Sequence, residues 1–146
     1  MSGGFKVIEH TSDIGIKVWG RTTKELMEEA AIGMVSQIYD PIKVKEKEIR
    51  RINCEADSIE ELLYLWLKEI LYLMETDDLL FHKFQIERDN FSFRNAGNFF
   101  MRASLYGEKR DSIRHDICNE IKAITRHGFY VKRKGPWWEG NLLFDV

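Results

Sequence analysis

The stretch Ser58–Glu75, which reads SIEELLYLWLKEILYLME, predicts a helix with apolar residues on most of its circumference. A serine followed three residues later by Glu61 is a helix-start pattern, in which hydroxyl and carboxylate cap backbone donors. The polar stripe of this helix is narrow. We therefore expect it to be mostly buried and packed on a sheet.

A second helix is expected before this one, because Thr22–Glu25 repeats the capping pattern and apolar residues recur behind it at helical spacing as far as Pro41. Alternating apolar residues predict strands around it. A hairpin is expected to turn at Asp89-Asn90. The predicted strands span residues 14–18, 52–56, 79–87, 91–93, 99–105, 117–127, 129–132 and 141–146.

Two strong helices leave room for few parallel crossovers, so the sheet is expected to be largely antiparallel or mixed. The sequence thus predicts an α+β fold, with the helices on one face of the sheet and residues 1–146 in a single domain.

Composition narrows the function classes. The chain has 146 residues, 44% hydrophobic and 32% charged, with a net charge of −2. This charge supplies no overall positive field to attract nucleic acid. Cys54 and Cys118 lie too far apart for a metal or redox motif, which favours a reducing, cytoplasmic setting. No signal peptide is expected, and the apolar stretch Leu62–Met74 is too short and too charged to span a membrane.

Asp13 and Asp145 stand near opposite ends of the chain, and Val146 follows the second of them. If the two ends meet, two carboxylates and the Val146 terminal carboxylate converge, and a cation between them would let them ionise together. Oxygen ligands favour calcium, with magnesium as the alternative. The competing interpretation is that Asp13 caps a turn and Asp145 is a solvated strand end.

Polar residues also gather in the segment 120–127, EIKAITRH. Glu120 and Lys122 share one face of an extended strand, which indicates either a solvated ion pair or part of a polar cluster beside a metal or phosphate. His10 and His127 are candidates to join such a cluster. No glycine-rich phosphate loop, zinc-binding helix or nucleophile elbow is present, and one of the adjacent tryptophans 137 and 138 is expected at an exposed sheet edge.

Three phrases in this order resemble the signatures of the archease family. They are residues 10–16 (HTSDIGI), 120–127 (EIKAITRH) and 143–146 (LFDV). The resemblance spans essentially the whole chain, with Ser12 in place of a commoner alanine and Arg126 in place of a commoner aromatic. Neither difference removes an acidic group.

The resemblance implies a fold of nested strand-helix-strand-strand modules and a non-catalytic role. Archeases assist the GTP-dependent tRNA-splicing RNA ligase, which joins 3′-phosphate or cyclic-phosphate ends to 5′-hydroxyl ends, by promoting guanylylation of its histidine and multiple turnover. Carried onto this chain, the resemblance implies that Asp13 and Asp145 form the metal-binding pair and that Glu120 and Lys122 lie on the activation surface. The transfer RNA is then reached only through the ligase.

Two other functions remain open from the sequence. One is a general chaperone or specificity modulator of tRNA-modifying enzymes. The other is a metal-dependent phosphoesterase, which is ranked last because a two-metal hydrolase needs more ligands than the sequence offers.

Overall fold

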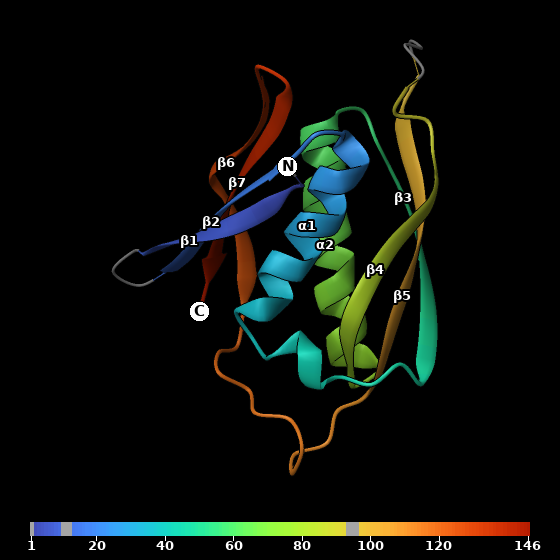
Figure 1. Cartoon of the computed structure of the whole chain (residues 1–146), viewed down its shortest axis with the longest axis vertical. Coiled ribbons are helices and arrows are strands. Elements are labelled where there is room, and N and C mark those ends of the chain that lie inside the picture. Colours follow the sequence, from blue (N-terminus) through green and yellow to red (C-terminus); the bar gives the residue numbers. More distant parts are fainter. Residues whose placement is uncertain (1, 10–12, 93–96) are drawn as a thin grey trace.

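In the computed structural model, residues 2–9, 13–92 and 97–146 are described. Two α-helices lie between two β-sheets, so the fold has three layers (Figure 1). The helices are α1 (Thr23–Ser36) and α2 (Ile59–Thr76), with a short 3-10 turn at Pro41–Lys43. The strands are β1 (Gly4–Glu9), β2 (Asp13–Gly20), β3 (Glu48–Ala56), β4 (Leu79–Asp89), β5 (Phe99–Lys109), β6 (Ala123–Lys134) and β7 (Trp137–Asp145).

Both helices begin where the capping patterns predict. The Thr22 hydroxyl accepts the Glu25 backbone N–H at 3.1 Å, and the Ser58 hydroxyl accepts the Glu61 N–H at 3.1 Å. The Glu25 carboxylate accepts the backbone N–H of Arg21 at 3.0 Å. Side-chain caps of this kind satisfy donors that the first helical turn leaves without a partner.

The strands form two antiparallel sheets, ordered β1-β2-β7-β6 and β3-β5-β4. The unit β3-α2-β4-β5 is a strand-helix-strand-strand module whose last strand pairs between its first and third. The outer unit β2-α1-β6-β7 repeats that order around it, since β7 pairs with both β2 and β6. The α+β class and the nested modules are therefore confirmed.

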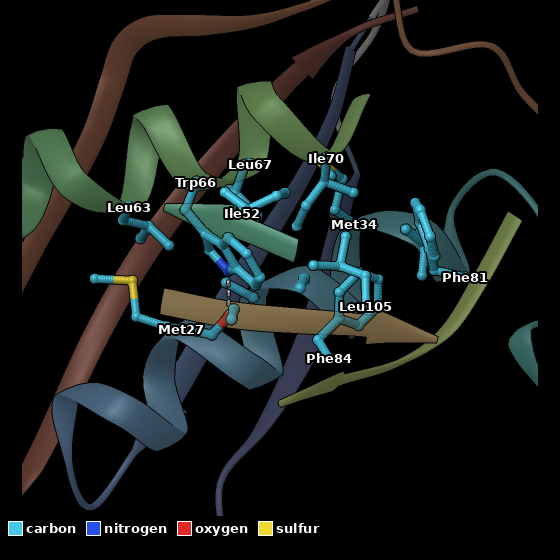
Figure 2. Packing of buried hydrophobic residues seen from close by; sticks show 14 of the residues in the cluster. Met27, Met34, Ile52, Leu63, Trp66, Leu67, Ile70, Phe81, Phe84 and Leu105 are labelled. Carbon is cyan, nitrogen blue, oxygen red and sulfur yellow. Dashed lines mark hydrogen bonds between the residues drawn. The ribbon is translucent and has the colours of Figure 1, made fainter. Parts of the chain in front are cut away.

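The helices lie between both sheets, which corrects the expectation that they cover one face of a single sheet. The cause is the breadth of the apolar surface on α2, where Leu62, Leu63, Trp66, Leu67 and Ile70 are fully buried. One sheet cannot cover a helix that is apolar on most sides. Figure 2 shows α2 residues packed towards α1 and the three-stranded sheet, with the Trp66 indole donating to the Met27 carbonyl at 2.9 Å.

The hairpin predicted around Asp89-Asn90 is wrong in its second arm. Phe91 lies in a turn, Phe93 lies outside the described residues, and β4 pairs instead with β5. The Asn90 side chain explains the difference, because its carbonyl accepts the Phe100 N–H at 2.8 Å and its amide donates to the Asn98 carbonyl at 3.0 Å. Asn90 thereby closes a longer loop.

The sequence predicts one of the tryptophans 137 and 138 at an exposed sheet edge, but neither of them lies there. Strand β7 is an inner strand between β2 and β6, and both indoles are half-buried. The Arg21 guanidinium lies 4.9 Å from the centre of the Trp137 ring. The Arg133 guanidinium lies 5.3 Å from the centre of the Trp138 ring.

Among the described residues, no helix is long and apolar enough to cross a membrane.

Candidate metal-binding and activation site

Asp13 and Asp145 are direct partners in the antiparallel pairing of β2 with β7. Residues directly opposite each other point to the same side of the sheet, with Cβ atoms about 4.5–5.5 Å apart. Ala123 on β6 is the partner of Asp145 on the other side, so its small methyl group completes this row. The fold thus brings the two acidic residues together from opposite ends of the chain.

Strand alternation decides which way these carboxylates face. Ile16, Leu142 and Phe144 are fully buried on the side of the sheet that packs against the helices. Asp13 and Asp145 occupy the alternate positions, which face away from the helices. Asp13 is half-buried and Asp145 is exposed, so both are accessible from solvent or to a partner.

Two like charges directly opposite each other destabilise a sheet, and a cation between them would remove that penalty. Within the described part of the chain, neither carboxylate has a hydrogen-bond or ion-pair partner. No three His, Cys, Asp or Glu side chains of this part are grouped for a metal ion. The carboxylates therefore form a pair, and His127 does not join it. His10 lies outside the described residues, and Val146 follows the pair, partly exposed. Their role as ligands stays a prediction.

Glu120 and Lys122 lie before β6, which corrects the expected strand over 117–127. The preceding residues bond to the turn that directly follows α1, since Cys118 N–H donates to the Ile38 carbonyl at 2.7 Å and the Asn119 amide donates to the Gln37 carbonyl at 2.8 Å. Those bonds hold the segment against the turn after α1, so its pairing with the sheet starts later. The first bond to the sheet is the one that Lys122 N–H donates to the Asp145 carbonyl at 2.8 Å.

The Lys122 backbone is therefore fixed to the acidic pair, but its side chain borders a different feature. Glu120 and Lys122 line a cleft of about 660 Å³ between residues 117–124 and α2. The cleft has an apolar floor and a rim of charged and tyrosine side chains. Its other polar lining residues include Tyr64, Lys68, Tyr72, Glu75 and Arg110.

His127 lies in a bulge of β6, where the pairing jumps from Thr125–Leu143 to Tyr130–Asn141. Its backbone N–H donates to the Thr125 hydroxyl at 3.1 Å, and its side chain is exposed. Gly128, with φ of +73°, supplies the left-handed conformation that the bulge requires. The structure therefore separates His127 from the acidic pair.

Arg126, beside this bulge, makes contacts with Glu61 and Tyr64 that the sequence did not predict. Its guanidinium donates two hydrogen bonds to the Glu61 carboxylate, at 2.6 and 2.9 Å, and lies 3.7 Å from the centre of the Tyr64 ring. The hydrogen bond from Arg126 holds the pKa of Glu61 below its ordinary value. Arginine suits this position because its planar group can pair with a carboxylate and stack on a ring at once. The contact fixes the bulge against α2.

Comparisons with known proteins identify the family. Residues 5–146 match the Archease protein family (MTH1598/TM1083). The chain belongs to the archease family. It is 35% identical over 139 residues to the protein archease of Pyrococcus furiosus, a match covering 94% of this chain and 95% of that one. It is 31% identical over 142 residues to that of Sulfurisphaera tokodaii, a match covering 97% and 98% of the two chains.

Solved structures show the same fold. A Methanobacterium thermoautotrophicum protein, 23% identical, superposes with a TM-score of 0.83 over 98% of this chain and 99% of that one. A Thermotoga maritima protein described as "an archease, possible chaperone" is 20% identical, with a TM-score of 0.57 over 97% and 96% of the two chains. The archease fold of two helices between two nested sheets is thus shared over nearly the whole chain.

Proposed function

We propose that this archease-family protein is a non-catalytic activator of the GTP-dependent tRNA-splicing RNA ligase, and that the pair Asp13 and Asp145 is its working tip. The observation that supports this most is the direct cross-strand pairing of two carboxylates on the open side of the sheet. Such a pair carries a repulsion that folding alone does not require. The ligase as partner comes from the family resemblance.

The residues present fit a divalent cation. Asp13 and Asp145 offer carboxylate oxygens from neighbouring strands, and oxygen donors suit calcium, which we favour, or magnesium. Both ions take at least six ligands. The remaining positions therefore fall to water, the Val146 carboxylate or groups of the ligase. When bound, the ion would supply positive charge to phosphate oxygens during nucleotidyl transfer.

The protein's own residues would position this tip rather than react. The pairing of β2 with β7 holds the carboxylates in register, and the Lys122 N–H fixes the Asp145 carbonyl. The side chains of Lys122 and Glu120 add charge along the neighbouring cleft. In this proposal the ligase carries out every covalent step.

Replacing Asp13 with asparagine is expected to raise the free energy of unfolding without metal by about 0.2–1 kcal/mol, because it removes a like-charged cross-strand neighbour. Calcium in excess should raise the melting temperature of the wild type, since a ligand that binds only the folded state stabilises it. The variant should lose that rise. Thermal unfolding of both proteins with and without calcium measures each effect, and an equal calcium shift in both would place the ion elsewhere.

The experiment that tests the function is ligase guanylylation with radiolabelled GTP, in the presence of the wild type or of Asp145→Asn. We expect the substitution to reduce the stimulation at least about tenfold, as removal of one charge-stabilising contact typically does. Glu55→Gln is the matched control, because Glu55 is an exposed strand carboxylate on the three-stranded sheet. If Asp145→Asn stimulates as the wild type does, the acidic tip is not the working part.

The same samples separate the other functions. A chaperone that acts without metal would keep its effect in Asp145→Asn. A phosphoesterase would release product from phosphodiester substrates without any ligase. The second alternative needs more ligands than the paired carboxylates of the described residues provide.

A further inference from the structure

The four-stranded sheet has one open side. Both helices pack against the same side of it (Figure 1), where Ile16, Val18, Leu142 and Phe144 are buried. The alternate residues of its strands face away from the helices. We call the half of this open side that lies away from Asp13 and Asp145 the basic end, defined by Lys6, Lys17, Tyr130, Lys132, Lys134 and Glu139.

The lysines of the basic end gather through strand register. Lys6 and Lys17 are direct partners across β1 and β2, so two like charges again face each other. Lys132 and Lys134 on β6 lie opposite Glu139 and Trp137 of β7. The Glu139 carboxylate is 3.8 Å from each of these lysines, and its side chain is only 15% exposed. One largely covered carboxylate thus faces a group of lysines.

Aromatic rings lie between these lysines on the same side of the sheet. The register places Trp19 beside Glu139, Tyr130 beside Asn141 and Trp137 beside Lys134. All three rings are half-buried, and the Lys132 ammonium is 4.8 Å from the centre of the Tyr130 ring. The surface therefore alternates flat rings with positive charges.

We propose that the basic end binds single-stranded RNA through its phosphates. Charge complementarity calls for a polyanion, and lysine provides a point charge that neutralises phosphate. Lysine is depleted in protein–protein interfaces, which argues against a protein as the occupant. A sheet surface that carries half-buried rings among positive charges also resembles the surfaces on which single-stranded bases stack.

The net charge of −2 does not reveal this basic surface, because it sums charges that lie far apart on the molecule. Strand β7 runs from Trp137 at the basic end to Asp145 at the acidic pair. At about 3.4 Å per residue, Trp137 lies about 27 Å from Asp145, and Lys17 lies about 14 Å from Asp13 along β2. Both distances exceed the Debye length of about 8 Å at physiological salt, so the acidic pair does not cancel the field of the lysines.

Fluorescence anisotropy of the full chain with a labelled single-stranded RNA tests the proposal. With four lysines engaged, the slope of log affinity against log salt is expected to be about −2.8, a loss of about 50-fold between about 50 and 200 mM salt. Lys132→Gln/Lys134→Gln should make the slope shallower by about 1.4 and weaken binding at low salt. Lys6→Gln/Lys17→Gln should do the same.

The matched control is Lys83→Gln/Arg88→Gln, which removes two exposed cations from β4 on the other sheet. It should leave the salt slope unchanged. The proposal is overturned if the wild type shows no salt-dependent RNA binding, or if the control weakens binding as much as the lysine pairs do. The proposal is also overturned if the two double lysine variants bind the ligase more weakly but bind RNA as the wild type does, since the surface would then contact protein.

RNA binding by the basic end does not depend on the proposed function, and two measurements separate them. Ligase guanylylation measured without RNA should respond to Asp145→Asn and not to Lys132→Gln/Lys134→Gln. RNA binding by the isolated protein should weaken in Lys132→Gln/Lys134→Gln and stay unchanged in Asp145→Asn.

Discussion

Replacing Gly107 with alanine is expected to destabilise the protein by about 3 kcal/mol or more. Gly107 lies in β5, paired with Glu48 on one side and Phe81 on the other. A Cβ atom at this position would lie 1.8 Å from the Leu80 carbonyl oxygen and 2.8 Å from the Phe81 Cα. Backbone cannot yield as a side chain does, so β4 and β5 would have to separate.

Urea unfolding of the full chain measures this effect, and Gly97→Ala is its control. A Cβ atom added at Gly97 meets no atom within 4 Å. That substitution should leave stability unchanged or raise it by up to about 1 kcal/mol, through the lower entropy of the unfolded chain. A Gly107→Ala protein within about 1 kcal/mol of the wild type would show that β4 and β5 adjust to the methyl group.

Replacing Glu108 with glutamine is expected to cost about 3 kcal/mol, because it breaks a buried charged network while keeping the side-chain volume. Glu108 is 2% exposed. Its carboxylate accepts hydrogen bonds from the Arg114 guanidinium, from Lys45 N–H at 2.7 Å and from His115 Nε2 at 3.1 Å. His115 Nδ1 in turn accepts the Asp111 N–H at 2.8 Å, so the ring donates to Glu108 as a neutral imidazole.

The control for Glu108 is Glu46→Gln, since Glu46 contacts His82 at 3.1 Å on the surface. Exposed pairs contribute at most about 1 kcal/mol. Equal losses in the two variants, measured by urea unfolding, would contradict a special role for the buried network.

The network also predicts a pH dependence. Desolvation acts to raise the pKa of Glu108, but the hydrogen bonds from Arg114, Lys45 and His115 outweigh it and lower the pKa to about 2 from the ordinary 4.5. A depressed folded-state pKa gives stability that is present above the unfolded value and is lost as pH falls towards the folded value. The stability difference between wild type and Glu108→Gln should therefore shrink between pH 4.5 and about 2. A constant difference over that range would contradict this assignment.

This network matters to the site because of the segment it anchors. Residues 110–122 connect the inner module to β6, and Arg114 and His115 fix the first part of this segment to β5. The later part bonds to the turn that directly follows α1 and then to the Asp145 carbonyl. Loss of the Glu108 carboxylate is therefore expected to loosen the segment 110–122, which leads to the acidic pair, as well as to lower the stability of the fold.

Local patterns in the sequence predicted where both helices begin, but they did not predict strand β1 (Gly4–Glu9). The hydroxyl caps at Thr22 and Ser58 mark the helix starts because they act within one turn. Within the predicted strand 141–146, alternation places Leu142 and Phe144 on one face and Asp145 on the other, and the structure buries the first two. The second hairpin arm shows the limit, since Phe91 lies in a turn and strand choice depends on a partner that a local turn signal does not specify.

The sequence by itself determined the two capped helices, the α+β class and the presence of an acidic residue near each end of the chain. Only the tertiary structure decided that Asp13 and Asp145 are cross-strand partners, that His127 lies apart in a bulge and that α1 and α2 lie between two sheets. The physical reason is range. Caps and alternation act over a few residues, whereas register and layering follow from burying both helices at once, which joins segments more than a hundred residues apart.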